Sequence, residues 1–186
     1  MLKQFYDLKA DVRHDGQYHP IRQLVTPDDP EVREIARVLI QAEDYISACQ
    51  DFVNSFTTYR REIGDYWATP RETIQAQTLR RELGIEFSCD CDDSSILLCS
   101  LLRNYIGPED VFCAVGEWNG GGHMFVVMLG EDKKDRIIES TASSKKPVRG
   151  NYRVLALFND KYTFACTEGL RDFCLIPVEE REAVYA

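Results

Sequence analysis

Apolar residues recur at helical spacing through the first half of the chain. After the Pro27–Pro30 stretch, Val32, Ile35 and Leu39 recur at this spacing. The same period continues over residues 45–56 and, after Pro70, over residues 71–81. The clearest helical pattern begins at Cys91, where Leu98, Leu101 and Leu102 mark a buried stripe. The pattern therefore predicts four helices before residue 105.

The second half changes to a strand-like period. Five segments are predicted as strands: Val111 to Trp118, His123 to Leu129, Arg136 to Ser140, Tyr152 to Phe158 and Tyr162 to Cys166. Helices followed by strands are typical of an α+β fold. We expect N-terminal helices, including the Cys91 helix, to pack on a mainly antiparallel sheet.

The first 30 residues differ from the rest. Lys9 to Gln23 is polar and contains Gly16 and Pro20, which predicts an irregular N-terminal arm over residues 1–30. The remaining length suits one globular domain, so we assign residues 31–186 to a single domain.

Composition excludes several classes of function. Thirty-one acidic against 22 basic residues leave a net charge of −9, which disfavours nucleic acid and anionic membranes as partners. No apolar run is long enough for a membrane span, and the opening residues do not resemble a signal peptide. Seven cysteines at irregular spacing predict free thiols and a cytoplasmic location.

The start of the Cys91 helix carries candidate chemistry. Asp90 suits the N-cap, and Asp93 resembles a capping-box partner. A helix N-terminus favours a thiolate at Cys91, whereas the carboxylates of Asp92 and Asp93 oppose it unless they turn outward. This position predicts that Cys91 is the most reactive of the seven thiols.

Two further residues fit a cysteine nucleophile. His123 is the only histidine beyond the first twenty residues, and it opens an apolar strand after a glycine run. Glu139 interrupts an apolar stretch on the next predicted strand, from which a carboxylate could reach the far nitrogen of His123. A base and an orienting acid are what such a nucleophile needs. Structural roles at a strand start and on an outward face remain open for these two residues.

These motifs resemble the transglutaminase-like superfamily, whose core is papain-like. The stretch from Asp90 to Arg103 resembles its nucleophile helix. His123 with Phe125 resembles its second motif, and Glu139 to Thr141 resembles its third. The segment from Tyr66 to Thr73 is similar to the lead-in helix of small bacterial and archaeal members.

The resemblance implies roles for these residues. Cys91 would be the nucleophile, His123 the general base and acid, and Glu139 the group that orients His123. The sequence departs from the pattern in three places: Glu139 stands where the family usually has Asp, Phe125 where it often has Trp, and Cys89 where it often has Gly. The backbone N–H of Cys91 is the natural first oxyanion donor. Trp67, Asp92 and Gly122 are candidates for the rest of the oxyanion site or the groove, with a core position as the alternative for Trp67.

Several functions stay open at this point. A cysteine peptidase or isopeptidase is favoured over a protein-glutamine acyltransferase, and a non-catalytic peptide-binding module is the third alternative. A metal site built on Cys89, Cys91 and a histidine has only a weak signature, so neither a metal nor a cofactor is expected. The expected partner is a protein or peptide substrate, and the net charge favours basic or lysine-containing ones.

Overall fold

The computed structural model describes residues 1–14, 16–60, 66–130, 135–146 and 148–178. The helices are α1 (Pro30–Leu39), α2 (Tyr45–Phe56), α3 (Pro70–Leu83), α4 (Cys91–Leu102) and α5 (Thr167–Asp172), with a 3-10 helix η1 at Ile21–Leu24. The strands are β1 (Lys3–Phe5), β2 (Asp7–His14), β3 (Gln17–Pro20), β4 (Val111–Trp118), β5 (Gly121–Met128), β6 (Arg136–Ile138), β7 (Tyr152–Phe158), β8 (Thr163–Ala165) and β9 (Ile176–Val178). None of the described helices is long and apolar enough to cross a lipid bilayer.

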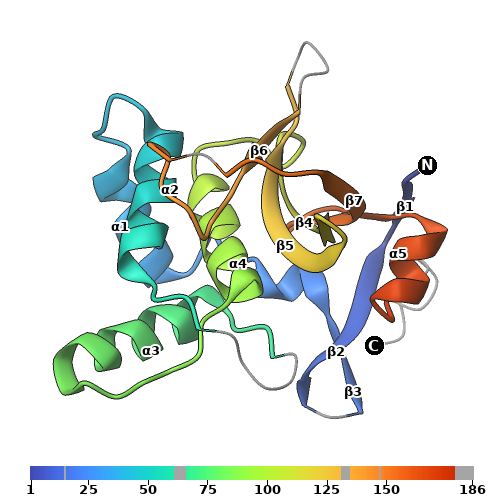
Figure 1. The fold of residues 1–186 in the computed structure, drawn as a ribbon, viewed down its shortest axis with the longest axis horizontal. Helices are drawn as coiled ribbons and strands as arrows, with labels where there is room; N and C mark the ends of the chain where they lie inside the picture. The colour runs from blue at the N-terminus through green and yellow to red at the C-terminus, as the bar shows by residue number, and fades with distance from the viewer. Residues whose placement is uncertain (15, 61–65, 131–134, 147, 179–186) are drawn as a thin grey trace.

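Six strands form the main sheet in the order β1-β8-β7-β4-β5-β6, with every neighbouring pair antiparallel. A smaller sheet has the order β3-β2-β9. Helix α4 lies between the main sheet on one side and α1, α2 and α3 on the other (Figure 1). The α+β class with an antiparallel sheet, predicted from the sequence, is confirmed.

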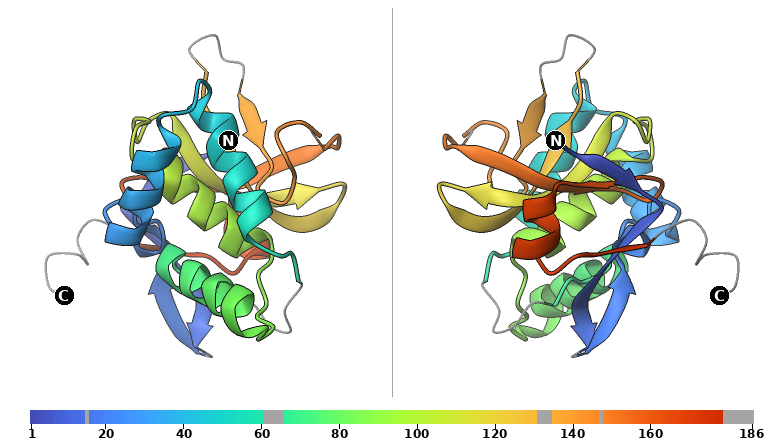
Figure 2. Two further views of the ribbon diagram at one scale, coloured as in Figure 1. Left: turned by 90° about the vertical axis from the view of Figure 1, so that its left-hand side faces the viewer. Right: turned by 90° about the vertical axis from the view of Figure 1, so that its right-hand side faces the viewer.

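Helix α4 lies at the centre of the core, and nearly all of its surface is covered by other elements. Every residue from Asp92 to Leu102 is buried. A helix buried all round is expected at the centre of a core rather than at a surface. The turned views show α4 between the other N-terminal helices and the strands of the main sheet (Figure 2). Its first residue, Cys91, is thereby held in a fixed place.

Local signals explain the helix that leads toward α4. Thr69 and Glu72 form a complete capping box at the start of α3, and Pro70 occupies the first turn. Gly84 ends the helix in the left-handed conformation, with φ of 68°. These residues fix the direction in which the chain returns toward Cys91.

The N-terminal arm is not irregular, which corrects the sequence-based expectation for residues 1–30. It contains β1, β2, β3 and η1. Strand β1 pairs with β8, and β2 pairs with β9. Leu8, Val12 and Ile21 from this segment are buried in the same core as α4. Pairing with strands more than 150 residues away stabilises β1 and β2, so the local pattern did not reveal these two strands.

Candidate functional site

The start of α4 places Cys91 at the first helical position, as expected. Asp90 is the N-cap, and its carboxylate accepts a hydrogen bond from the N–H of Asp92 at 3.4 Å. Asp93 does not complete a capping box, because its carboxylate accepts from the N–H of Ala68 at 2.8 Å. Asp93 therefore ties the segment before α3 to the start of α4.

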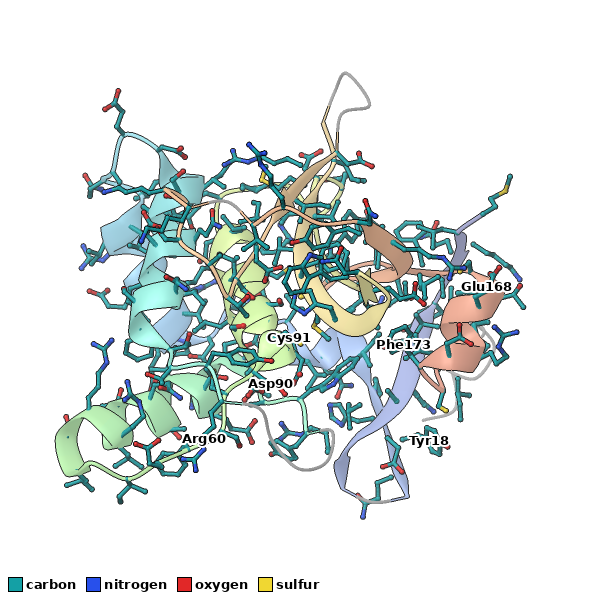
Figure 3. The ribbon with its side chains drawn as sticks, in the orientation of Figure 1. Tyr18, Arg60, Asp90, Cys91, Glu168 and Phe173 are labelled. Carbon is teal, nitrogen blue, oxygen red and sulfur yellow. The ribbon has the colours of Figure 1, made fainter. Side chains whose placement is uncertain are left out.

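Cys91 meets β5 at Met124, the residue that follows His123. Its half-buried thiol accepts a hydrogen bond from the backbone N–H of Met124, which directly follows His123. One helical turn on, the Ser95 hydroxyl donates to the Met124 carbonyl at 3.1 Å. Figure 3 shows Cys91 at the end of α4 that lies next to this part of the sheet. The helix start and the histidine strand therefore meet at this point.

His123 contacts Glu139 directly. The Nε2 atom of His123 lies 2.8 Å from Oε2 of Glu139, and both side chains are largely buried. His123 belongs to β5, and Glu139 directly follows β6, the neighbouring strand. The contact between this acid and the imidazole of His123, expected from the sequence, is present.

Three further groups hold the Glu139 carboxylate. The N–H and hydroxyl of Thr141 donate to Oε1 at 3.2 and 2.8 Å, and the Tyr152 hydroxyl donates to Oε2 at 3.2 Å. Burial opposes ionisation, yet the bonds from His123 and Thr141 keep the pKa of Glu139 below its usual value. Glu139 is therefore a fixed carboxylate that faces an imidazole.

Aromatic rings from β4, β5 and β7 lie near His123. Trp118 lies at 5.6 Å from it and Phe125 at 6.0 Å, measured between ring centroids. Tyr152 stacks on Trp118 at 6.3 Å and meets Phe125 edge to face at 4.9 Å. These rings limit the orientations that the imidazole can adopt.

The sequence analysis missed Tyr152, and it included Ser140 and Thr141 in the third motif without giving either residue a role of its own. The Ser140 hydroxyl lies 2.9 Å from the hydroxyls of both Ser94 and Ser95, so it joins α4 to the segment that holds Glu139. A run of small hydroxyl residues directly after Glu139 was the available signal. Tyr152 gave none, because its place opposite Glu139 depends on strand register.

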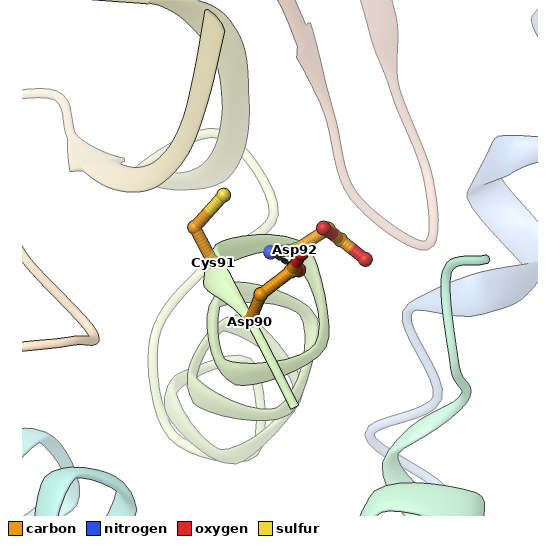
Figure 4. Close-up of side chains that lie close together, drawn as sticks. All are labelled: Asp90, Cys91 and Asp92. Carbon is orange, nitrogen blue, oxygen red and sulfur yellow. Dashed lines mark hydrogen bonds between the residues drawn. The ribbon is translucent and has the colours of Figure 1, made fainter. Parts of the chain in front are cut away.

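The carboxylates near Cys91 do not turn outward. Asp92 is 6% exposed, and no described residue bonds its Oδ2 atom. Burial, a hydrogen bond with Asp90 and the nearby charge of Asp93 raise the pKa of Asp92 far above its usual value. Figure 4 shows the Cys91 thiol and the Asp92 side chain leaving the helix start in different directions. Asp92 is therefore part of the interior and does not line a groove.

The Cys91 thiol is protonated at neutral pH. Burial raises its pKa to about 12, with further contributions from Asp92, Asp90 and Glu139. The bond from the Met124 N–H opposes this rise only in part. The sequence predicted a Cys91 thiolate only if the carboxylates of Asp92 and Asp93 turn outward. Both side chains are buried, so this condition is not met.

Iodoacetamide labelling should show this protonation. We expect the alkylation rate of Cys91 to rise about tenfold per pH unit between roughly pH 7 and 10, because the thiolate fraction does so below the pKa. Exposed Cys174 should react ahead of Cys91 at neutral pH, which reverses the order expected from the sequence. Timed digests analysed by mass spectrometry give each rate. A Cys91 rate already constant from pH 6 to 8 would contradict the prediction.

Two other sequence candidates have different surroundings. Trp67 is 5% exposed and stacks on Phe158 with 6.0 Å between ring centroids, so it occupies the core position considered as its alternative. Gly122 is exposed at the start of β5, and a Cβ atom there would lie 3.7 Å from the Phe173 ring. Only Gly122 therefore lies at a rim.

A cation could be held at the helix start. Asp90, Cys91 and Asp92 each place one ligand atom within 4.8 Å of the others (Figure 4). Oxygen ligands suit hard cations, whereas the thiolate suits softer ones. This set differs from the Cys89, Cys91 and histidine set considered from the sequence.

The arrangement of a buried helix against an antiparallel sheet is shared with solved structures. The structure is similar to that of LapG from Legionella pneumophila after EGTA treatment, with a TM-score of 0.52 at 13% identity over 81% of this chain and 91% of that chain. A second LapG structure gives a TM-score of 0.50 at 14% identity, over 76% and 91%. At this identity the likeness concerns the fold alone.

Sequence comparison adds nothing to this likeness. No protein-family profile matches the chain, and no curated protein matches it.

Proposed function

We propose that this chain is a transglutaminase-like thiol hydrolase that cleaves amide or peptide bonds through Cys91, His123 and Glu139. The observation that carries the proposal is the 2.8 Å contact between His123 and Glu139, next to a cysteine at the start of a buried helix. The likeness of the fold to a cysteine protease supports it.

The hydrogen bond to Glu139 defines the role of each imidazole nitrogen. An ionised carboxylate only accepts hydrogen bonds, so Nε2 of His123 carries a proton. Nδ1 is then the basic nitrogen, available to take a proton from Cys91. Glu139 would stabilise the imidazolium that results.

The reaction proceeds in two halves. The Cys91 sulfur attacks the substrate carbonyl carbon as its proton passes to Nδ1 of His123, and the Cys91 N–H donates to the oxyanion. The imidazolium returns the proton to the leaving amine, the C–N bond breaks, and a thioester remains. His123 then takes a proton from a water molecule as the water oxygen attacks the thioester carbonyl carbon. The C–S bond breaks, the carboxylic acid leaves, and the imidazolium returns its proton to the Cys91 sulfur.

A peptide library tests hydrolysis against transfer. Glutamine-containing peptides are supplied with and without a labelled primary amine, and products are read by mass spectrometry. We expect free acid or cleaved peptide at rates insensitive to the amine, and no product from Cys91→Ala. Efficient amine incorporation would replace the proposal with an acyltransferase, and binding without turnover would favour a peptide-binding module.

Glu139→Gln should reduce the turnover rate far more than substrate affinity. The amide keeps the shape of the side chain but loses the charge that stabilises the His123 imidazolium, so we expect a loss of roughly 10²–10⁴-fold in kcat. Tyr152→Phe removes one bond to the same carboxylate and should cost about tenfold or less. The measurements are kcat and KM for one peptide. Equal losses in kcat and affinity for Glu139→Gln would indicate a purely structural carboxylate.

A further inference from the structure

The main sheet is apolar on both faces although helices α1 to α4 cover only one. Residues Val111 to Val115 of β4 and Met124 to Val127 of β5 are buried without alternation. One face of the sheet packs with α4, and the other carries a separate cluster that includes Phe112 and Phe125. Antiparallel sheets with one solvated face normally alternate apolar and polar residues. The face opposite α4 is therefore apolar, and its buried cluster is bordered by partly buried side chains that include Leu2, Val154 and Phe164.

A groove of 530 Å³ lies on this second face. Its floor includes Phe112, Val127 and Leu157, and its edge includes Leu129, which is 37% exposed. Among the described residues lining it, only Glu109 and Asp135 are charged. The groove thus combines an apolar floor with two carboxylates.

Both carboxylates lie at one end of the groove. Glu109 precedes β4, Asp135 precedes β6 and Leu129 follows β5. Because these neighbouring strands are antiparallel, all three residues lie at the same end of the strands. Both acids are exposed, and neither forms an ion pair with another residue in the part of the chain that the structure describes. They are free to attract a cation.

The opposite end of the same face carries the proposed catalytic histidine. His123, Phe125, Val127 and Leu129 alternate along one strand, so they project from one side of the sheet. Six residues of strand span about 20 Å. A segment bound in the groove would therefore lie within one extended hexapeptide of His123.

We propose that this groove binds a segment of the protein substrate with large apolar side chains followed by lysine or arginine. The inference rests on the proposed function, because the segment belongs to the chain being cleaved. Complementary charge at Glu109 and Asp135 favours the basic end. The net charge of −9 disfavours a second copy of the chain and an anionic lipid surface.

Peptide binding to Cys91→Ala tests the inference without turnover. The probes are two fluorescein-labelled nonapeptides that share three large apolar residues and differ in ending on two lysines or two glutamates. Fluorescence anisotropy should give an affinity at least tenfold higher for the lysine peptide. Adding Glu109→Lys and Asp135→Lys should remove that preference. Adding Glu43→Lys and Glu82→Lys, which change the net charge equally at exposed sites elsewhere, should leave it within twofold.

Three results would overturn the inference. Equal affinity for both peptides would exclude recognition of the charged end. If the control variant with Glu43→Lys and Glu82→Lys loses the lysine preference to the same extent, the preference depends only on the net charge of the protein. A dimer in light scattering that the Glu109 and Asp135 changes convert to monomer would assign the groove to a second copy. Turnover by the unaltered chain without a lysine preference would reject this inference alone. Lysine-selective binding without any turnover would reject only the proposed hydrolysis.

Discussion

Replacing Cys91 by alanine should abolish turnover while leaving the fold intact. Loss of a nucleophile costs at least about 10³-fold in rate in enzymes of this kind of mechanism. Cys91 is half-buried at the first position of α4 and contributes little volume to the core, so we expect a loss of about 1 kcal/mol in the free energy of unfolding. Turnover of a selected peptide and urea unfolding give the two quantities.

Cys89 provides the matched control for this variant. It lies two residues away and is 1% exposed, so Cys89→Ala should cost as much stability as Cys91→Ala or more. Its turnover should stay within about threefold of the original, since it touches none of the proposed reacting groups. If both variants lose activity in proportion to their stability, the loss reflects folding and Cys91 is not the nucleophile.

Asp92→Asn should stabilise the protein, and the gain should grow with pH. The pKa of Asp92 is raised in the folded state, so the folded chain binds a proton that the unfolded chain releases above about pH 4. Stability is then lost as pH rises above the unfolded pKa, by up to about 1.4 kcal/mol per unit. Asparagine is neutral throughout and removes this loss.

Urea unfolding of Asp92→Asn and the original chain at pH 5, 6, 7 and 8 tests this expectation. The difference in free energy of unfolding should increase across the series. Asp28→Asn, at a side chain that is 81% exposed, should give a difference that stays nearly constant. A constant difference for Asp92→Asn would show that its carboxyl is ionised in the folded protein.

The sequence predicted correctly those helices and strands whose stability depends on residues close together in the chain. The predicted bounds of β4 and β7 match the structure, and α4 begins at Cys91 as expected. Each of these segments has an uninterrupted apolar period and clear flanking signals. Strands β1 and β2 are short or polar, and their partners lie near the other end of the chain. No local window contains that information.

The candidate site likewise contains features that the sequence predicted and features that depend on distant parts of the chain. Motif order and spacing were enough to single out His123 and Glu139, which the structure brings into contact. The direction of the Asp92 side chain depends on the packing around α4, and it reverses the expected electrostatics at Cys91. Tyr152 reaches Glu139 through the pairing of β7 with β4 and of β4 with β5. Sequence spacing alone does not determine such a register.

The pairing of β1 with β8 has a consequence for the order of folding. Lys3 lies opposite Ala165, so the sheet is completed only after almost the whole chain has left the ribosome. Contacts of such large sequence separation form late. Strand β7, which carries Tyr152, is flanked by β4 and by this late-forming β8. The Tyr152 bond to Glu139 therefore depends on a strand whose outer neighbour is completed late in synthesis.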